Sequence, residues 1–203
     1  EWYGIDPHDD SDNLVITQNK VYENGRHGII CSKRCDNVQI TNNDSSNNGG
    51  SGIMIHRYVT DSVVSGNIAN NNNDSGIAIF DSHSNLIFGN IARNNTKGIR
   101  LSVGSSDNII KSNNFSYNSA YGIFTYKGTD LPTFGDGRIK SNTFANNTVG
   151  WNGYYGLKIK EADNNHFEGN NIIANNAGIC LIDSRNNYFV NNLLQRNTQD
   201  YCE

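Results

Sequence analysis

A pattern of glycine, an apolar residue, any residue and a second apolar residue recurs along the chain, and it limits the fold more than any other feature. Successive copies lie mostly about 22 to 24 residues apart. Repetition at such a period is typical of a solenoid, in which each repeat packs only on its neighbours. The copies begin at Gly28, Gly52, Gly76, Gly98, Gly122, Gly156 and Gly178, with Thr125 as the one polar substitute.

Asparagine and large apolar residues recur with the same period. Asparagine tolerates left-handed backbone angles at corners, and its amide can bond to equivalent residues in the coils above and below. The pattern therefore predicts asparagine ladders at the corners of stacked coils. One column reads Asn24, Asn48, Asn72, Asn94, Asn118 and Asn152; a second reads Asn19, Asn43, Asn67, Asn90, Asn113, Asn142, Asn170 and Asn192; an apolar column three residues before the second reads Ile16, Ile40, Val64, Ile87, Ile110, Ile139, Phe167 and Phe189.

Each repeat contains several short segments in which apolar and polar residues alternate, bounded by Gly, Asn, Asp or Ser. This alternation predicts β-strands rather than helices. We predict an all-β fold, a single-stranded right-handed parallel β-helix that forms one domain over residues 1–203. Two coils are longer than the rest and predict loops that leave the stack: 106–136, which carries Gly128 to Asp136, and 137–162, which carries Val149 to Tyr155.

Composition excludes several classes of protein. The chain has 36 asparagines and only 35% hydrophobic residues, but its regularly placed Ile, Val, Leu and Phe argue against disorder. No run approaches the ~20 apolar residues that span a bilayer, so we predict no membrane insertion. A net charge of −4 argues against a nucleic-acid partner.

The four cysteines are Cys31, Cys35, Cys180 and Cys202, and their spacing does not match a zinc site. Two interpretations remain open for Cys31: a disulfide with Cys35 across a tight corner, or a buried free thiol. We predict no metal site and no cofactor, and the sequence leaves a calcium requirement open.

The opening segment, residues 1–11, breaks the repeat. Tyr3, His8 and the carboxylates of Asp6, Asp9 and Asp10 lie within eight residues, with a proline between the first aspartate and the histidine. This density of titratable groups favours a proton-transfer site. The alternative is an ordinary turn, because Asp-Pro and Asp-Asp-Ser are common turn formers.

The stretch Tyr3-Gly-Ile-Asp-Pro-His-Asp9 resembles the Tyr-Gly-x-Asp-Pro-His-Asp motif of mannuronan C5-epimerases, which are parallel β-helices that act on alginate. The resemblance continues through the coils around His27-Gly-Ile-Ile, Ser51-Gly with Arg57, and Leu86-Ile-Phe-Gly-Asn90, and covers residues 1 to about 140. It implies an exported protein that binds an anionic polysaccharide and converts mannuronate to guluronate at C5.

The resemblance also implies roles for individual residues. His8 would be the base and Tyr3 the opposing proton donor, with Asp6 holding the imidazole in its working tautomer. Arg57 would neutralise the substrate carboxylate, on which charge develops when C5 loses its proton. The surrounding groove would consist of His27, Lys33, Arg34 and His56, made positive by its basic residues, with Asp81, Arg100 and Lys127 further along.

Two other functions remain open at this stage. A polysaccharide lyase shares the abstraction of the C5 proton but then expels the 4-linked sugar. A non-catalytic carbohydrate-binding β-helix would use the opening motif only as a turn. Neither end of the sequence shows an amphipathic cap, so we expect either end-to-end self-association or further N-terminal coils in a longer protein.

Overall fold

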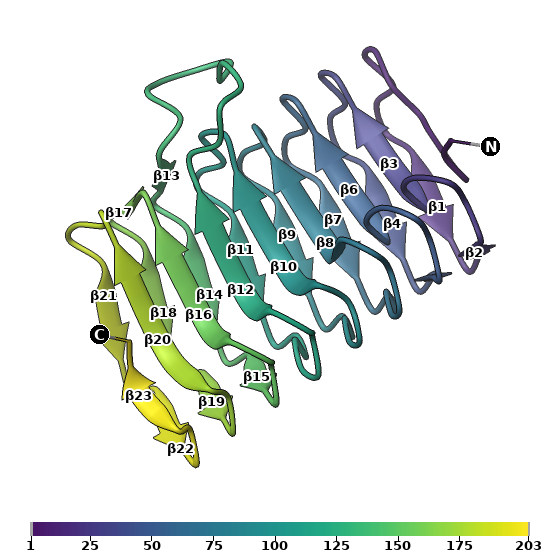
Figure 1. Ribbon diagram of the computed structural model, residues 1–203. Coiled ribbons are helices and arrows are strands. Elements are labelled where there is room, and N and C mark those ends of the chain that lie inside the picture. Colours follow the sequence, from purple (N-terminus) through teal and green to yellow (C-terminus); the bar gives the residue numbers. More distant parts are fainter. Residues whose placement is uncertain (1, 203) are drawn as a thin grey trace.

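The computed structural model describes residues 2–202, and Figure 1 shows them as one stack of parallel coils wound in a right-handed β-solenoid. Every strand pair in this part of the chain is parallel, so each coil bonds to the equivalent segment of the next coil. This confirms the predicted fold class. No helix among the described residues is long and apolar enough to cross a membrane.

The glycine pattern forms one long sheet, here called the front sheet. Its register pairs Ile29 with Ile53, Ile53 with Ile77, Ile77 with Ile99 and so on, which confirms the predicted column. Its strands, in spatial order, are β3 (Ile29–Ser32), β6 (Ile53–His56), β8 (Ser75–Phe80), β10 (Lys97–Ser102), β12 (Tyr121–Tyr126), β16 (Tyr155–Lys160), β20 (Ala177–Ile182) and β23 (Gln199–Tyr201).

A second sheet, the back sheet, lies on the other side of the core, and three short sheets close the sides of the coils. The back sheet consists of β1 (Val15–Thr17), β4 (Gln39–Thr41), β7 (Val63–Ser65), β9 (Leu86–Phe88), β11 (Ile109–Lys111), β14 (Thr143–Ala145), β18 (His166–Glu168) and β21 (Tyr188–Val190). The short sheets pair β2 (Lys20–Tyr22) with β5 (Asp44–Ser46), β13 (Ile139–Lys140) with β17 (Ala162–Asp163), and β15 (Thr148–Gly150) with β19 (Asn171–Ile173) and β22 (Leu193–Gln195).

Stacked apolar side chains fill the space between the sheets. Phe144 and Phe167 are fully buried, and their rings stack 4.7 Å apart, as do those of Phe167 and Phe189. The register pairs Phe144, and not Ile139, with Ile110 and Phe167. The predicted place of Ile139 in this column is therefore wrong; Ile139 pairs with Ala162 at the side of the coil.

Asparagine ladders run along the corners as predicted, but two of their members differ. The amide of Asn72 bonds to Asn95 rather than to Asn94, because the corner before Gly98 is one residue shorter than in the preceding coils. The amide of Asn113 bonds to Asn147, while Asn142 belongs to a third ladder that was not predicted. That third ladder runs through Asn85, Asn108, Asn142, Asn165 and Asn187.

Within residues 2–202, one coil carries an insertion. Ladder partners lie 34 residues apart from Asn113 to Asn147, but 23 apart in the next step, so the extra residues form a single loop. This loop, residues 127–138, joins β12 to β13 and projects from the stack at the edge where the front strands end (Figure 1). The predicted second loop at 149–155 is wrong, because β15 and the start of β16 lie in regular positions there.

The cysteines settle the open alternative. Cys31 and Cys35 are buried free thiols in the core, so the interpretation as a disulfide between them is wrong. Cys180 and Cys202 form a disulfide instead, which links β20 to the following coil across 22 residues of sequence. Closing a loop of that length stabilises a fold by about 3 kcal/mol in the chain-entropy description.

Candidate functional site

The opening segment extends the front sheet by one more row. Ile5 pairs with Ile29 and His8 with Ser32 in parallel bridges, and the backbone N–H of Ile30 donates to the carbonyl of Ile5 at 2.9 Å. Tyr3, Asp6 and His8 therefore occupy the row before β3, in register with His27, Ile30 and Ser32. The predicted catalytic residues lie on the same outward face as the predicted substrate-binding residues.

His8 is oriented by its neighbour Asp9. The ring Nδ1 lies 2.6 Å from Asp9 Oδ2. This hydrogen bond, with Lys33 and Arg34 nearby, holds the pKa of the Asp9 carboxyl below its ordinary value. Because an ionised carboxylate only accepts hydrogen bonds, Nδ1 carries the hydrogen, and Nε2 of the neutral ring is left with its lone pair. The prediction that Asp6 orients the imidazole is wrong in this structure; Asp6 is exposed between Tyr3 and His8 in the same row.

His27 is held between Tyr3 and the next coil. Its ring stacks on Tyr3 with centroids 5.6 Å apart and planes 3° apart, and its Nδ1 accepts the backbone N–H of Ser51 at 2.9 Å. The neutral ring therefore carries its hydrogen on Nε2. Burial lowers the pKa of His27, and the positive charge of Arg100 lowers it further.

His56 lies one coil beyond His27, where its ring packs against Phe80 at 4.7 Å. Burial, with smaller contributions from the charges of Arg57 and His27, lowers the pKa of His56 to about 4. Both imidazoles are therefore uncharged at neutral pH. The expected contribution of these two histidines to a positive groove is wrong at that pH; they offer hydrogen bonds instead.

The floor between these polar groups is apolar. Ile30, Met54 and Ala78 point outward from successive front strands, yet each is buried, with Tyr3 and Phe80 packed against them. Burial beside this floor explains why the neighbouring histidines resist protonation.

The predicted cations lie in the turns that follow the front strands. Two consecutive residues with positive φ make each turn, so Asp9-Asp10, Lys33-Arg34 and Arg57-Tyr58 stack in neighbouring coils. Arg34 forms a two-pronged ion pair with Asp10, with nitrogen to oxygen distances of 2.7 and 2.9 Å, and Lys33 Nζ lies 3.6 Å from Asp9. Carboxylates of this chain thus already occupy these two sites.

Arg57 is paired with the 127–138 loop. Its Nη2 lies 3.0 Å from Oδ2 of Asp130, which is 73 residues away in sequence. The loop is anchored on Asp81, a fully buried carboxylate that accepts the backbone N–H and the hydroxyl of Thr133 at 3.0 and 2.6 Å. The loop therefore covers the turns of the second and third rows.

A cavity of about 440 Å³ lies between the loop and those turns. Phe134 of the loop packs against Tyr58 at 5.3 Å between ring centroids and closes one side of it. The cavity is lined by Lys33, Arg34, Arg57, Tyr58, Thr133 and Phe134. It combines three cations with aromatic walls, an arrangement suited to a carboxylated sugar.

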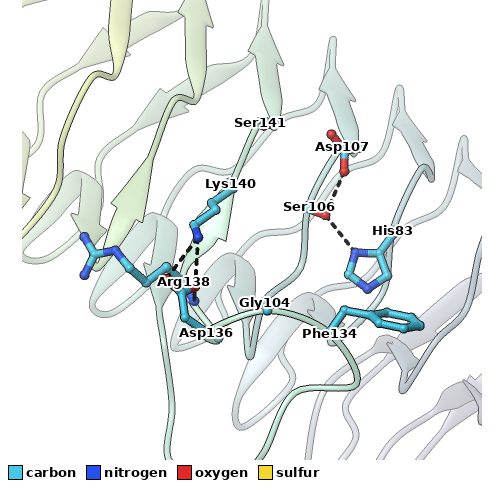
Figure 2. Close-up of a pocket in the computed structure, with 11 residues that line it drawn as sticks. His83, Gly104, Ser106, Asp107, Phe134, Asp136, Arg138, Lys140 and Ser141 are labelled. Carbon is cyan, nitrogen blue, oxygen red and sulfur yellow. Dashed lines mark hydrogen bonds and ion pairs between the residues drawn. The ribbon is translucent and has the colours of Figure 1, made fainter.

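A smaller pocket of about 250 Å³, shown in Figure 2, is also lined by Phe134 and was not predicted from the sequence. The hydroxyl of Ser106 donates to Asp107 at 2.8 Å, so Nδ1 of His83 must donate to that hydroxyl. Burial lowers the pKa of His83. Isolated parallel β-bridges pair His83 with Ser106 and Ser106 with Lys140 in successive coils. In the sequence, only the positions of the asparagine ladders could have indicated this register.

The remaining candidates lie further along the front face. Arg100 and Lys97 both bind Asp74, at 3.7 and 2.5 Å, and Arg100 also donates to the hydroxyl of Tyr126 at 3.2 Å. Lys127 is exposed at the start of the loop. Among residues 2–202, no cluster of His, Cys, Asp and Glu side chains is arranged to hold a metal ion.

Comparison with protein families gives two matches. The model described as a right-handed β-helix region matches residues 3–142, and the model of the periplasmic copper-binding protein NosD matches residues 136–201. No curated protein sequence matches the chain.

Several solved structures are similar to this chain. The periplasmic alginate epimerase AlgG is 29% identical, with a TM-score of 0.71, over 94% of this chain and 42% of AlgG. The A-module of the Azotobacter vinelandii mannuronan C-5 epimerase AlgE4 is 19% identical, with a TM-score of 0.85, over 99% of this chain and 58% of the module. The Dettilon tailspike protein is 14% identical, with a TM-score of 0.60, over 90% and 49%. The last two show the fold alone, and the chain spans less than half the length of AlgG.

Proposed function

This chain belongs to the family of right-handed β-helix proteins, and we propose that within it the chain is a mannuronan C5-epimerase. The observation that carries the proposal is the first row of the front face, where His8, with Nδ1 held by Asp9, and Tyr3 lie on either side of an exposed carboxylate. The 29% identity to AlgG over nearly the whole chain supports it.

The spacing of Tyr3 and His8 suits attack from two faces of one sugar. They lie five residues apart in the first row, with a bend of the chain at Gly4 between them. Both side chains point outward, which leaves room for a pyranose ring between them. Asp6 lies under that ring and accepts hydrogen bonds from its hydroxyl groups.

In the proposed reaction, the C5–H bond of mannuronate breaks and the proton passes to Nε2 of His8. The bonding electrons move into the substrate carboxylate, which becomes an enediolate. The Tyr3 hydroxyl then donates a proton to the opposite face of C5, which gives guluronate. The imidazolium returns its proton to solvent and the phenolate recovers one, so the enzyme is unchanged.

Substrate carboxylates are proposed to bind Lys33, Arg34 and Arg57 in the cavity beside the first row. Each must exchange its present partner, Asp9, Asp10 or Asp130, for a carboxylate of the polymer. His27 and His56, being uncharged at neutral pH, donate or accept hydrogen bonds to sugar hydroxyls.

Proton NMR of polymannuronate incubated with the protein tests the reaction. Guluronate signals are expected, whereas unsaturated chain ends would identify a lyase, and an unchanged spectrum would identify a binding protein. His8→Ala should lower kcat by about a thousandfold, in the range of general acid–base catalysis. His166→Ala is the matched control, because His166 also lies beside a carboxylate, Glu168, but on the back sheet. Equal losses in both variants would contradict the role of His8.

Two further variants test the other roles. Tyr3→Phe should lose turnover but keep polymer binding, because only the phenolic hydroxyl is removed. Arg57→Ala should lower kcat/KM more than Arg57→Lys, which keeps the charge without the planar fork. Normal kcat in Tyr3→Phe would place the proton donor elsewhere.

We also propose that the protein is exported and that its proton transfers need no cofactor. The disulfide between Cys180 and Cys202 supports an oxidising compartment. AlgG and NosD are both described as periplasmic. Turnover that survives a metal chelator would agree with the second proposal, and its loss would point to a metal such as calcium.

A further inference from the structure

One cation on the front sheet differs from all the others. Four lysines and arginines lie within its strands, and three of them bind carboxylates: Lys97 and Arg100 bind Asp74, and Lys160 lies 3.8 Å from Glu161. The fourth, Lys158, has no carboxylate within 4.0 Å of its Nζ in the part of the chain that the structure describes. A half-buried cation without an internal counter-ion is suited to bind an external anion.

Aromatic rings surround this ammonium. Its Nζ lies 4.8 Å from the ring centre of Tyr121, 5.4 Å from that of Tyr155 and 5.8 Å from that of Phe124. It also donates to the Tyr121 hydroxyl at 3.2 Å. An ammonium has three donors, so two remain available to a ligand. The rings hold the cation by cation–π attraction without neutralising its charge.

Lys158 is aligned with the first row along the axis of the stack. In the register of the front sheet, the residues that follow Asp6 in the same column are Ile30, Met54, Ala78, Arg100, Phe124 and Lys158. Six strand steps at ~4.8 Å each separate the two positions by roughly 29 Å. The coils between them form a straight, unbroken stack in Figure 1.

We propose that Lys158, Tyr121, Phe124 and Tyr155 form a distal subsite for a uronate residue of the polymer, in which the ammonium binds the carboxylate and the rings contact the sugar. The proposal rests on the proposed function and deepens it. A pyranose ring is about as long as the spacing of strands, so a polymer lying along the axis places about one sugar on each coil. The subsite then takes a sugar about six residues from the one at His8.

Equilibrium binding of mannuronate oligomers tests this subsite. The variants are Lys158→Ala, the conservative Lys158→Arg, and Lys111→Ala as the matched control, since Lys111 also lies over a ring, that of Phe88 at 5.5 Å, but on the back sheet. The ligands are a mannuronate tetramer, an octamer and a methyl-esterified octamer, which has the rings without the charges.

For wild type, we expect the octamer to bind more tightly than the tetramer, because only the octamer reaches from His8 to Lys158. Lys158→Ala should weaken octamer binding by about tenfold and remove this gain with length. Lys158→Arg should retain most of the affinity, and Lys111→Ala should stay within about twofold of wild type. The esterified octamer should not distinguish Lys158→Ala from wild type.

Octamer affinity that is unchanged in Lys158→Ala, or that falls equally in Lys111→Ala, would overturn the subsite, as would failure of the wild type to bind the octamer. The outcome is separate from that of the proposed function, since binding needs no turnover. Octamer binding that depends on Lys158, without epimerisation, would support the subsite and refute the proposed enzymatic function. Epimerisation together with octamer binding that does not depend on Lys158 would support the enzymatic function and refute the subsite.

Discussion

The anchor of the 127–138 loop on Asp81 gives a sharp prediction about access to the cationic cavity. Asp81→Ala removes the acceptor of two Thr133 donors, the backbone N–H and the hydroxyl. The contact of Phe134 with Tyr58 and the Arg57–Asp130 ion pair remain, so the loop should still close, but less firmly.

The size of the effect follows from these two donors. Hydrogen bonds to a charged group are worth about 1.5–3 kcal/mol each, and Asp81 is fully buried in the closed loop. Once the loop opens, water can replace the carboxylate as the acceptor, so we take the low end of this range for each of the two hydrogen bonds. The free energy of opening the loop should then fall by about 3 kcal/mol. That corresponds to about a hundredfold larger open population.

Hydrogen exchange of the peptide that spans the loop measures this population. Asp61→Ala is the control, because Asp61 is exposed and has φ 45°, against φ 46° for Asp81, so both changes place alanine in the same left-handed conformation. Exchange in the loop should accelerate about a hundredfold in Asp81→Ala relative to Asp61→Ala. Equal exchange in the two variants would refute the reasoning and assign the anchoring to Phe134 or Asp130.

Three more predictions concern the stack and the site. Asn90→Ala removes a buried amide that donates two hydrogen bonds and accepts two, so it should lower the free energy of unfolding, measured in denaturant, by about 4 kcal/mol. The exposed control Asn73→Ala should lower it by at most about 0.5 kcal/mol, and similar losses in the two variants would contradict the ladder's role. The pKa of His56 is lowered to about 4, so between about pH 6.5 and 4 the unfolded chain binds the proton that the folded chain refuses, and stability falls as pH falls. His56→Phe should flatten this part of the pH dependence, and an unchanged slope would refute the assignment. Asp130→Asn frees Arg57 and should lower the KM for polymannuronate by about threefold; an unchanged or higher KM would show that the pair does not compete with substrate.

The sequence predicts the fold well where one residue type is required by the backbone. The glycines that begin the front strands leave no room for a side chain: a Cβ on Gly52 would lie 2.6 Å from the carbonyl oxygen of Ser45 and 2.9 Å from that of Gly76. Such positions recur in successive coils up to Gly178. A fixed distance from these glycines predicts the ladder wrongly where a corner changes length: it predicts Asn94, but the ladder residue is Asn95.

The insertion explains the other errors of register. The 127–138 loop adds its residues after β12, so equivalent positions across it lie 34 residues apart and not 23. Ile139 and Asn142 lie 29 residues after Ile110 and Asn113 and keep the three-residue spacing of the apolar and asparagine columns, but those columns continue at Phe144 and Asn147. Side-chain hydrogen bonds select the true partner, and spacing alone does not contain that information.

The site could be predicted only as far as the repeat reaches. Tyr3, Asp6 and His8 fall in one row because the opening segment continues the register of the front sheet. The Arg57–Asp130 pair joins residues 73 apart through an irregular loop, which no periodicity describes. The disulfide was readable in principle, since Cys180 and Cys202 occupy one column, but Asp200 replaces the glycine that would have marked the last row.

The ion pairs also change what the net charge of −4 means for binding a polyanion. Around His8 the cations are neutralised by carboxylates of the same chain, yet these partners are exposed: the side chains of Arg34 and Asp10 are 55% and 61% accessible. Exposed pairs contribute little stability, so they exchange readily for another carboxylate. A polyuronate presents many carboxylates on one chain, and each one bound raises the effective concentration of the next. Binding would then depend on exchange along successive coils, and an overall negative charge does not oppose it.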